Sequence, residues 1–269
     1  MTLAHIGILL VAGAGAGFAS GLLGVGGGFI MVPVSYKVIL SAGIPPAVAI
    51  RTALGTTLMV ILPTVISGAF GHKRKNAIDG KIALGLGSSG LTGSFCGATL
   101  AARLPSRILE VGFGSVVLAI ALWMFLGTIL RLPQRSGEQG KNLKLVALCG
   151  FPIGVVTGLT GLGGGVFIVP LLVLWLNFPM QVAVGTSVAA IVCISSGGVA
   201  GYIVNGLGAS VPPYSLGYIN LPIWLSLAAT SIPMAQLGAR AAHSLPAKQL
   251  RYIFIACMAY IGLKMIGLF

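Results

Sequence analysis

Long apolar segments dominate the pattern of hydrophobic and polar positions along the chain. Stretches such as Ile108–Leu130 and Tyr252–Phe269 are almost continuously apolar and show no alternation of apolar and polar residues. A helix needs about 20 apolar residues to cross the hydrocarbon core of a bilayer, whereas a barrel strand is about ten residues of alternating pattern. The pattern therefore predicts an all-α polytopic membrane protein.

Two copies of one glycine-rich element interrupt these apolar segments. GLLGVGGGFIMVP at Gly21–Pro33 is matched by GLTGLGGGVFIVP at Gly158–Pro170, 137 residues later. Two further pairs of similar segments follow at offsets of 134 and 141 residues. They are VAIRTA from Val48 with VAVGTS from Val182, and GATLAARLP from Gly97 with GARAAHSLP from Gly238. Loops of different length explain the different offsets, so the chain consists of two homologous halves.

A polar segment, RLPQRSGEQGKNLK at Arg131–Lys144, separates the two halves. We expect residues 1–130 to form the first transmembrane repeat, 131–144 the linker and 145–269 the second repeat. Each half is expected to hold a glycine-broken element followed by three spans, which gives about eight membrane elements. The expected elements are 4–42, 47–70, 81–102 and 107–130, and then 145–177, 181–204, 216–239 and 249–268.

The positions of lysine and arginine indicate how the glycine-broken elements sit in the membrane. If each element crossed the membrane once, nine of the 16 basic residues would lie on one side of the membrane and seven on the other. This difference is too small to indicate the orientation of the protein. If each element is a hairpin of two short helices, eleven basic residues lie on one side of the membrane and five on the other. This split agrees with the enrichment of basic residues in cytoplasmic loops. The eleven are Lys73, Arg74, Lys75, Lys81, Arg131, Arg135, Lys141, Lys144, Arg240, Lys248 and Arg251, and the five are Lys37, Arg51, Arg103, Arg107 and Lys264.

Length also favours the hairpin. A single helix over residues 4–42 would be about 58 Å long, nearly twice a bilayer core of about 30 Å. With hairpins each half has an odd number of crossings, so we expect inverted repeats with both termini outside. No basic residue precedes the first apolar stretch, so the N-terminus is expected to be a membrane element of the cytoplasmic membrane and not a signal peptide.

Composition excludes several classes of function. The chain is 57% hydrophobic and 7% charged, whereas soluble domains are about a quarter charged. The net charge is +13, and the basic residues lie in short loops without interleaved aromatic residues. We therefore expect membrane lipid as a partner and do not expect nucleic acid. Neither a metal nor a cofactor is expected, because Cys96, Cys149, Cys193 and Cys257 form no C-x-x-C pair. GLGSSG at Gly85–Gly90 resembles a dinucleotide fingerprint in spelling only, since no strand precedes it.

The glycine clusters are the first candidate substrate site. Irregular backbone inside a membrane is tolerated only where protein or a water-filled cavity covers it. Helices that restart at Phe29 and Val166 would direct backbone N–H groups and the positive ends of their dipoles toward a bound anion. The alternative is that the glycines only allow close helix packing. The clusters comprise Gly24, Gly26, Gly27 and Gly28, with Gly161, Gly163, Gly164 and Gly165.

Hydroxyl side chains and one arginine follow the glycine clusters. Hydroxyl donors could complete the coordination of an oxyanion, although Ser and Thr in membrane helices often bond their own backbone. Arg51 lies at the edge of an apolar run, where an intramembrane functional role and an interfacial, snorkelling role are both open. The hydroxyl candidates are Thr52, Thr56, Thr57, Thr186 and Ser187.

The paired G-L-x-G-x-G-G-G-x-x-x-V-P elements, each followed by V-A-x-x-T, resemble the TauE/SafE family of sulfite exporters and related anion permeases. The resemblance covers nearly the whole chain. It implies a plasma-membrane transporter of about eight helices that moves sulfite, sulfonates or related sulfur anions, with a substrate that varies among members. Within this chain it points to the two glycine clusters and the hydroxyls that follow them.

Acidic residues are scarce, since Asp79, Glu110 and Glu138 are the whole inventory and only Glu110 lies close to a span. His5, His72 and His243 lie near expected span ends. Intramembrane carboxylates or histidines commonly form proton relays. We therefore hypothesise that no dedicated carboxylate relay exists, and that the anion gradient, the membrane potential or protons carried on the substrate drive transport.

A secondary transporter of small anions is the function that these features predict. An enzyme would need a nucleophile, a metal cluster or paired carboxylates at usable spacing, and the sequence offers none. A scaffolding protein would not need two matched glycine breaks. An anion channel, or a permease for a small carboxylate, remains the alternative, and the anion, the direction and the oligomeric state stay open.

Overall fold

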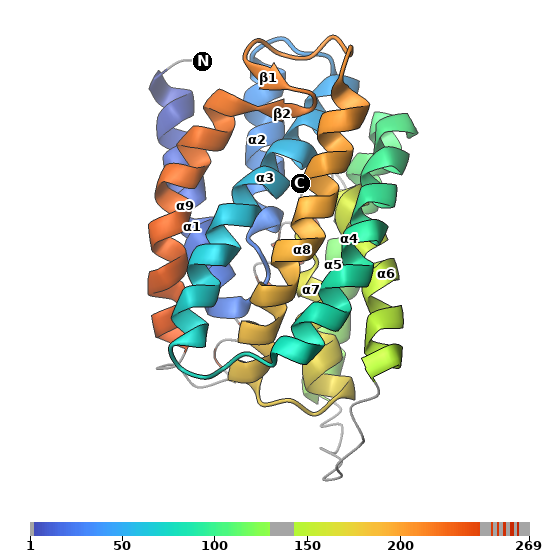
Figure 1. Ribbon diagram of the computed structural model, residues 1–269. Helices are drawn as coiled ribbons and strands as arrows, with labels where there is room; N and C mark the ends of the chain where they lie inside the picture. Colours follow the sequence, from blue (N-terminus) through green and yellow to red (C-terminus); the bar gives the residue numbers. More distant parts are fainter. Residues whose placement is uncertain are drawn as a thin grey trace.

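The computed structural model describes residues 3–129 and 143–242, together with isolated positions between 249 and 263. Nearly all of the described chain is helical (Figure 1). The helices are α1 (Leu3–Leu23), α2 (Gly28–Ser41), α3 (Pro46–Lys73), α4 (Gly80–Arg103), α5 (Ser106–Ile129), α6 (Leu143–Thr160), α7 (Gly165–Pro170), α8 (Met180–Gly206) and α9 (Leu221–Ala242). A π-helical turn, Leu171–Trp175, continues α7, and two short antiparallel strands, β1 (Ser215–Leu216) and β2 (Ile219–Asn220), precede α9.

These helices agree with the expected spans, with two differences. The span expected from residue 216 begins only at Leu221, because Asn220 ends the strand pair and its side-chain oxygen accepts from the N–H of Ile223. The element expected to run to residue 177 passes into the π-helical turn after Pro170. The span expected at 249–268 and the linker at 131–144 fall largely outside the described residues.

Each glycine-broken element is two helices with a turn between them. The side chains of Ser41 and His5 lie 3.2 Å apart, so α2 returns to the end of the bundle at which α1 begins. In Figure 1, α6 begins at the opposite end, and α7 turns back toward it. The first hairpin therefore opens on one end of the bundle and the second on the other.

Small residues allow the first helix of each half to pack closely against a helix of the other half. Gly13, Gly17 and Gly21 on α1 lie against the backbone of α9, and a Cβ at any of them would overlap a carbonyl oxygen there. Gly150, Gly154 and Gly158 on α6, each 137 residues later, lie in the same way against α4. Such small-residue interfaces are typical of helices that associate within membranes.

The helices α3 and α8 form the centre of the bundle. Both are long and apolar enough to cross a membrane, as is α1, and both are buried over most of their length. Around them the outer helices expose large apolar side chains, including Leu84, Leu148 and Leu225. Exposed apolar surface of this extent is typical of a protein that faces lipid. The prediction of an all-α membrane protein is confirmed.

Candidate functional site

The two glycine turns have the irregular backbone that the sequence predicted. Gly26 and Gly27 have φ angles of 84° and 77°, and Gly163 and Gly164 have φ angles of 85° and 82°. These values lie in the left-handed region, which glycine adopts without the steric cost that a Cβ atom brings. Gly24 and Gly161 share this geometry. Both turns are buried.

The two turns lie directly against each other, although 137 residues separate them. A Cβ on Gly28 would overlap the carbonyl oxygen of Gly161, and a Cβ on Gly165 would overlap that of Gly24. A Cβ on Gly26 would stand 3.4 Å from the carbonyl oxygen of Leu162. The glycine clusters therefore meet backbone to backbone, and we call this contact the glycine junction.

A helical segment starts from each side of the glycine junction. Gly27 precedes α2 and Gly164 precedes α7, and within the described structure no side chain caps either helix start. The first backbone hydrogen bonds run from Ile30 and Met31 to the Gly27 carbonyl. Those of the second half run from Phe167 and Ile168 to the Gly164 carbonyl. Two helix N-termini, the positive ends of the helix dipoles, therefore begin at the junction.

The central helices form the walls of the glycine junction. Ile61 of α3 lies beside both Gly26 and Gly163, and Leu54 lies beside Gly161. From α8, Val184 lies beside Gly24 and Ile191 beside Gly165. Each central helix thus contacts both turns. A movement of either helix would therefore change the contacts at the junction.

The carbonyl group at the start of each glycine element is held by a side chain from a central helix. The Nε2 atom of His72 lies 3.0 Å from the Gly21 oxygen, and the Tyr202 hydroxyl donates to the Gly158 oxygen at 2.8 Å. Gly21 and Gly158 are equivalent positions of the repeat. These contacts fix the ends of α1 and α6 just before the chain enters the turns.

Three of the predicted hydroxyls are bonded to backbone groups in the structure. The Thr186 hydroxyl accepts from the N–H of Asp79, and the Thr56 hydroxyl accepts from the N–H of Asn220, both at 2.9 Å. Asp79 and Asn220 are the N-cap residues of α4 and α9, so these threonines hold equivalent helix starts in the two halves. Ser187 donates to the Gly24 carbonyl at 2.8 Å and so binds the glycine junction itself.

Other hydroxyls are fully buried and have no hydrogen-bond partner among the described residues. Thr52 and Thr57 of α3 are two of them, and Thr57 stands three residues after Leu54 and four before Ile61, on the face that touches the glycine junction. Ser94 of α4 and Ser195 of α8 share this condition. A buried hydroxyl without a partner costs about 1–3 kcal/mol, so each needs an explanation such as a bound ligand or water.

Ser94 and Ser195 were not predicted from the sequence. Ser195 lies four residues after Ile191, which contacts Gly165, and Ser94 lies beside Gly198 on the next turn of α8. Their only signal in the sequence is a polar residue within an apolar span. Serines are common in such spans. These two are distinguished only by the structure, in which their hydroxyls are buried and have no hydrogen-bond partner among the described residues.

Arg51 connects two helices. Its Nη2 atom donates to the carbonyl oxygen of Leu104, the C-cap residue of α4, at 3.0 Å. Its Nε atom is buried without a hydrogen-bond partner in the described part of the chain. Arg51 is three residues before Leu54 on α3, and its guanidinium group binds the C-terminal end of α4.

Glu110 is bonded to the helix that follows the first glycine turn. The Tyr36 hydroxyl of α2 donates to a Glu110 carboxylate oxygen of α5 at 2.7 Å. Within the described residues, no group of three or more His, Cys, Asp or Glu side chains is placed to hold a metal ion. The polar groups at the glycine junction are backbone N–H and carbonyl groups, and hydroxyl side chains stand on the helices around them.

Comparison with known proteins gives consistent results. Residues 9–265 match the family described as sulfite exporter TauE/SafE. A protein of Methanocaldococcus jannaschii is 30% identical over 96% of this chain and 94% of its own length. A protein of Haemophilus influenzae is 31% identical over 96% of this chain and 97% of its own length. A third, YdhB of Bacillus subtilis, is 31% identical over 71% of this chain and 76% of its own length.

All three relatives bear the name "probable membrane transporter protein", which describes transport and not an enzymatic reaction. No solved structure shows a significant match to the chain. The family match extends over both glycine turns, the central helices and the hydroxyls described above. The chain therefore belongs to the TauE/SafE sulfite exporter family of membrane transporters.

Proposed function

We propose that this protein is a secondary carrier that exports or exchanges small sulfur-containing anions, such as sulfite or organosulfonates, across the cytoplasmic membrane. The observation that carries the proposal is the glycine junction, at which two helix N-termini from opposite hairpins begin. The description of the family as sulfite exporters supports the sulfur anion as substrate.

The chemistry of the junction suits an oxyanion. Backbone N–H groups at helix N-termini bind anions through hydrogen bonds and through the helix dipole, without a charged side chain. The unpartnered hydroxyls of Thr57 and Ser195 stand on the two central helices that touch the junction. Thr56 and Thr186 accept hydrogen bonds, so each retains a hydroxyl proton that it can donate. A sulfite or sulfonate group offers three oxygen atoms to such donors.

Inverted repeats would explain how the junction is reached from both sides of the membrane. The pairing of α1 with α9 is matched by that of α6 with α4, as a two-fold relation between the halves requires. The hairpins open on opposite ends of the bundle (Figure 1). In carriers built this way, one repeat moves against the other around a site near the midplane. The eleven-against-five split of the basic residues supports an orientation with both termini outside the cell.

Thermal unfolding of the purified protein tests the substrate class. A ligand that binds only the folded state raises the melting temperature by mass action. We expect sulfite, thiosulfate or a short sulfonate to raise it in a saturable manner, and the same anion to raise it less for Thr57→Val. Stabilisation by small carboxylates alone would contradict a sulfur anion as substrate and would favour a small carboxylate instead. Stabilisation by no anion would contradict the proposed site.

A channel with the same architecture is the second candidate. Flux through a carrier saturates with substrate and shows counterflow, whereas flux through an open pore shows neither. Proteoliposomes loaded with unlabelled anion and exposed to labelled anion distinguish the two. Transient accumulation of label above equilibrium identifies a carrier, and simple equilibration identifies a channel.

A further inference from the structure

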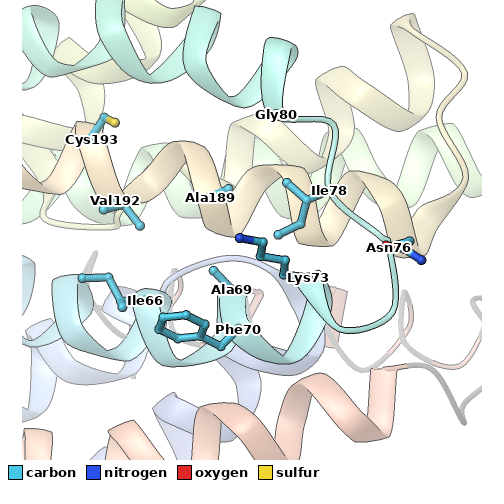
Figure 2. Close-up of a pocket in the computed structure, with 10 residues that line it drawn as sticks. All are labelled: Ile66, Ala69, Phe70, Lys73, Asn76, Ile78, Gly80, Ala189, Val192 and Cys193. Atoms are coloured by element: carbon cyan, nitrogen blue, oxygen red, sulfur yellow. The ribbon is translucent and has the colours of Figure 1, made fainter.

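A groove of about 600 Å³ lies between α3, α8 and the loop that leads into α4. Figure 2 shows Ile66, Ala69 and Phe70 of α3 facing Ala189 and Val192 of α8 across it. Ile78 and Gly80 close one end. The walls are therefore aliphatic and aromatic, and this groove is separate from the glycine junction because none of its lining residues belongs to the two turns.

The groove opens on the outside of the helix bundle. Phe70 is 59% exposed and Ile66 is 40% exposed, although both belong to a helix long and apolar enough to cross a membrane. These side chains lie in the last turns of α3, which ends at Lys73. If α3 spans the bilayer, the apolar groove faces lipid acyl chains, and the end of α3 lies among lipid headgroups.

Lys73 brings a positive charge into the apolar groove. Figure 2 shows its side chain extending from α3 toward α8, with the ammonium nitrogen over the groove near Ile78. Arg74, Lys75 and Lys81 are exposed beside it. Asp79 is the acidic residue of this loop, and its carboxylate accepts from the backbone N–H of Ile82 at the start of α4. The mouth of the groove thus carries a net positive charge.

We propose that this groove binds an anionic phospholipid, with an acyl chain along Ile66, Phe70 and Val192 and the phosphate at the Lys73 ammonium group. An apolar slot that ends at a basic cluster matches both parts of such a lipid. Basic pockets between transmembrane helices on the cytoplasmic side are typical sites for anionic headgroups. The groove lies at the end of the bundle where α5 ends and α6 begins, which the distribution of basic residues assigns to the cytoplasm (Figure 1).

Native mass spectrometry of the detergent-purified protein tests the proposal, with equal amounts of phosphatidylglycerol and phosphatidylcholine as probes. We expect preferential retention of phosphatidylglycerol, and a loss of about fivefold in its affinity for Lys73→Gln, the size of one basic contact near a membrane surface. Lys37→Gln is the matched control, because Lys37 is an exposed lysine on α2, near the opposite end of the bundle. It should leave retention unchanged.

Two further arms make the outcome decisive. Val192→Trp fills the groove and should reduce retention of phosphatidylglycerol even though every basic residue is kept. Inorganic phosphate at equal concentration should not displace the lipid, since a free anion gains nothing from the apolar walls. Equal retention of the two lipids, equal losses for Lys73→Gln and Lys37→Gln, or full displacement by phosphate would each overturn the proposal. Melting temperatures of all variants confirm that the measured proteins are folded.

Discussion

The substitution Gly28→Ala tests whether the contact at the glycine junction controls transport. Gly28 has an ordinary helical backbone, so alanine adds no strain in φ, and the whole effect comes from the added methyl group. That group would overlap the carbonyl oxygen of Gly161 in the opposite turn. A normal carbon–oxygen separation of about 3.5 Å then requires the two turns to move apart by about 1 Å. We expect a loss of stability of about 1–3 kcal/mol, as for other overpacked sites.

The effect on transport should exceed the effect on stability. A displacement of about 1 Å within a binding site can lower a rate by about 100-fold, because donors no longer converge on the substrate. We therefore expect sulfite transport per folded molecule to fall by about 100-fold in proteoliposomes. The amount of folded protein is measured by size-exclusion chromatography before reconstitution.

Gly17→Ala is the matched control for this prediction. Its methyl group would overlap the backbone of Ser231, also between two halves of the chain, but it would point toward α9 and not toward Gly27, which the neighbouring residue Ala16 contacts. It should lower the melting temperature by a similar amount and leave the rate per folded molecule within about threefold. Equal losses of rate for Gly28→Ala and Gly17→Ala would refute the reasoning, because the glycines would then serve helix packing alone.

Three other predictions concern polar side chains. Thr57→Val removes a buried hydroxyl that has no partner in the described structure, so stability should stay equal or rise by up to about 1 kcal/mol while the affinity for sulfite falls; titration of the melting temperature with sulfite measures both. Thr186→Val removes the acceptor of the Asp79 N–H bond and should lower the free energy of unfolding by about 1–3 kcal/mol. Thr52→Val removes a hydroxyl without a partner in the described structure and should leave that free energy unchanged. Equal melting temperatures for the two variants would contradict these different roles of the two hydroxyls. Tyr36→Phe breaks the bond to Glu110, and under the hypothesis of no carboxylate relay its pH profile of transport should match that of the parent protein; a shifted profile would make Glu110 part of the coupling.

Much of the helical arrangement could be predicted from the sequence, because the bilayer imposes strong limits on it. The breaks at Gly24–Gly28 and Gly161–Gly165 were predicted from the repeated glycine element, the positions of the basic residues and the length of the apolar segments, and the structure has both. The π-helical turn at Leu171–Trp175 could not be predicted, since it depends on how the residues after Pro170 pack against α7 and α8. The late start of α9 follows from the cap at Asn220, which a hydropathy pattern does not register.

The candidate site was only partly accessible from the sequence. The two glycine clusters were identified by their repetition, but their direct contact depends on the packing of α3 and α8. Five hydroxyls looked alike in the sequence, yet Thr56 and Thr186 hold N-cap residues whereas Thr52 and Thr57 have no partner in the described chain. Their partners come from helix starts more than 100 residues away, and local pattern carries no information on such contacts.

The series Gly13, Gly17 and Gly21, with its repeat at Gly150, Gly154 and Gly158, is a sequence pattern that indicates close helix contacts. Glycine at every fourth position marks one face of a helix, and such a face is the usual contact between membrane helices. This spacing would have predicted that α1 and α6 each pack closely against another helix. It would not have identified α9 and α4 as the partners.

Counterflow of ³⁵S-labelled sulfite in proteoliposomes tests whether the glycine junction is the site of a sulfite carrier. The glycine junction as a carrier site predicts that vesicles loaded with unlabelled sulfite accumulate label transiently above equilibrium, that the initial rate saturates with sulfite, and that Gly28→Ala abolishes the overshoot while Gly17→Ala keeps it. Absence of sulfite flux in the parent protein, or an overshoot that survives in Gly28→Ala, would contradict the account.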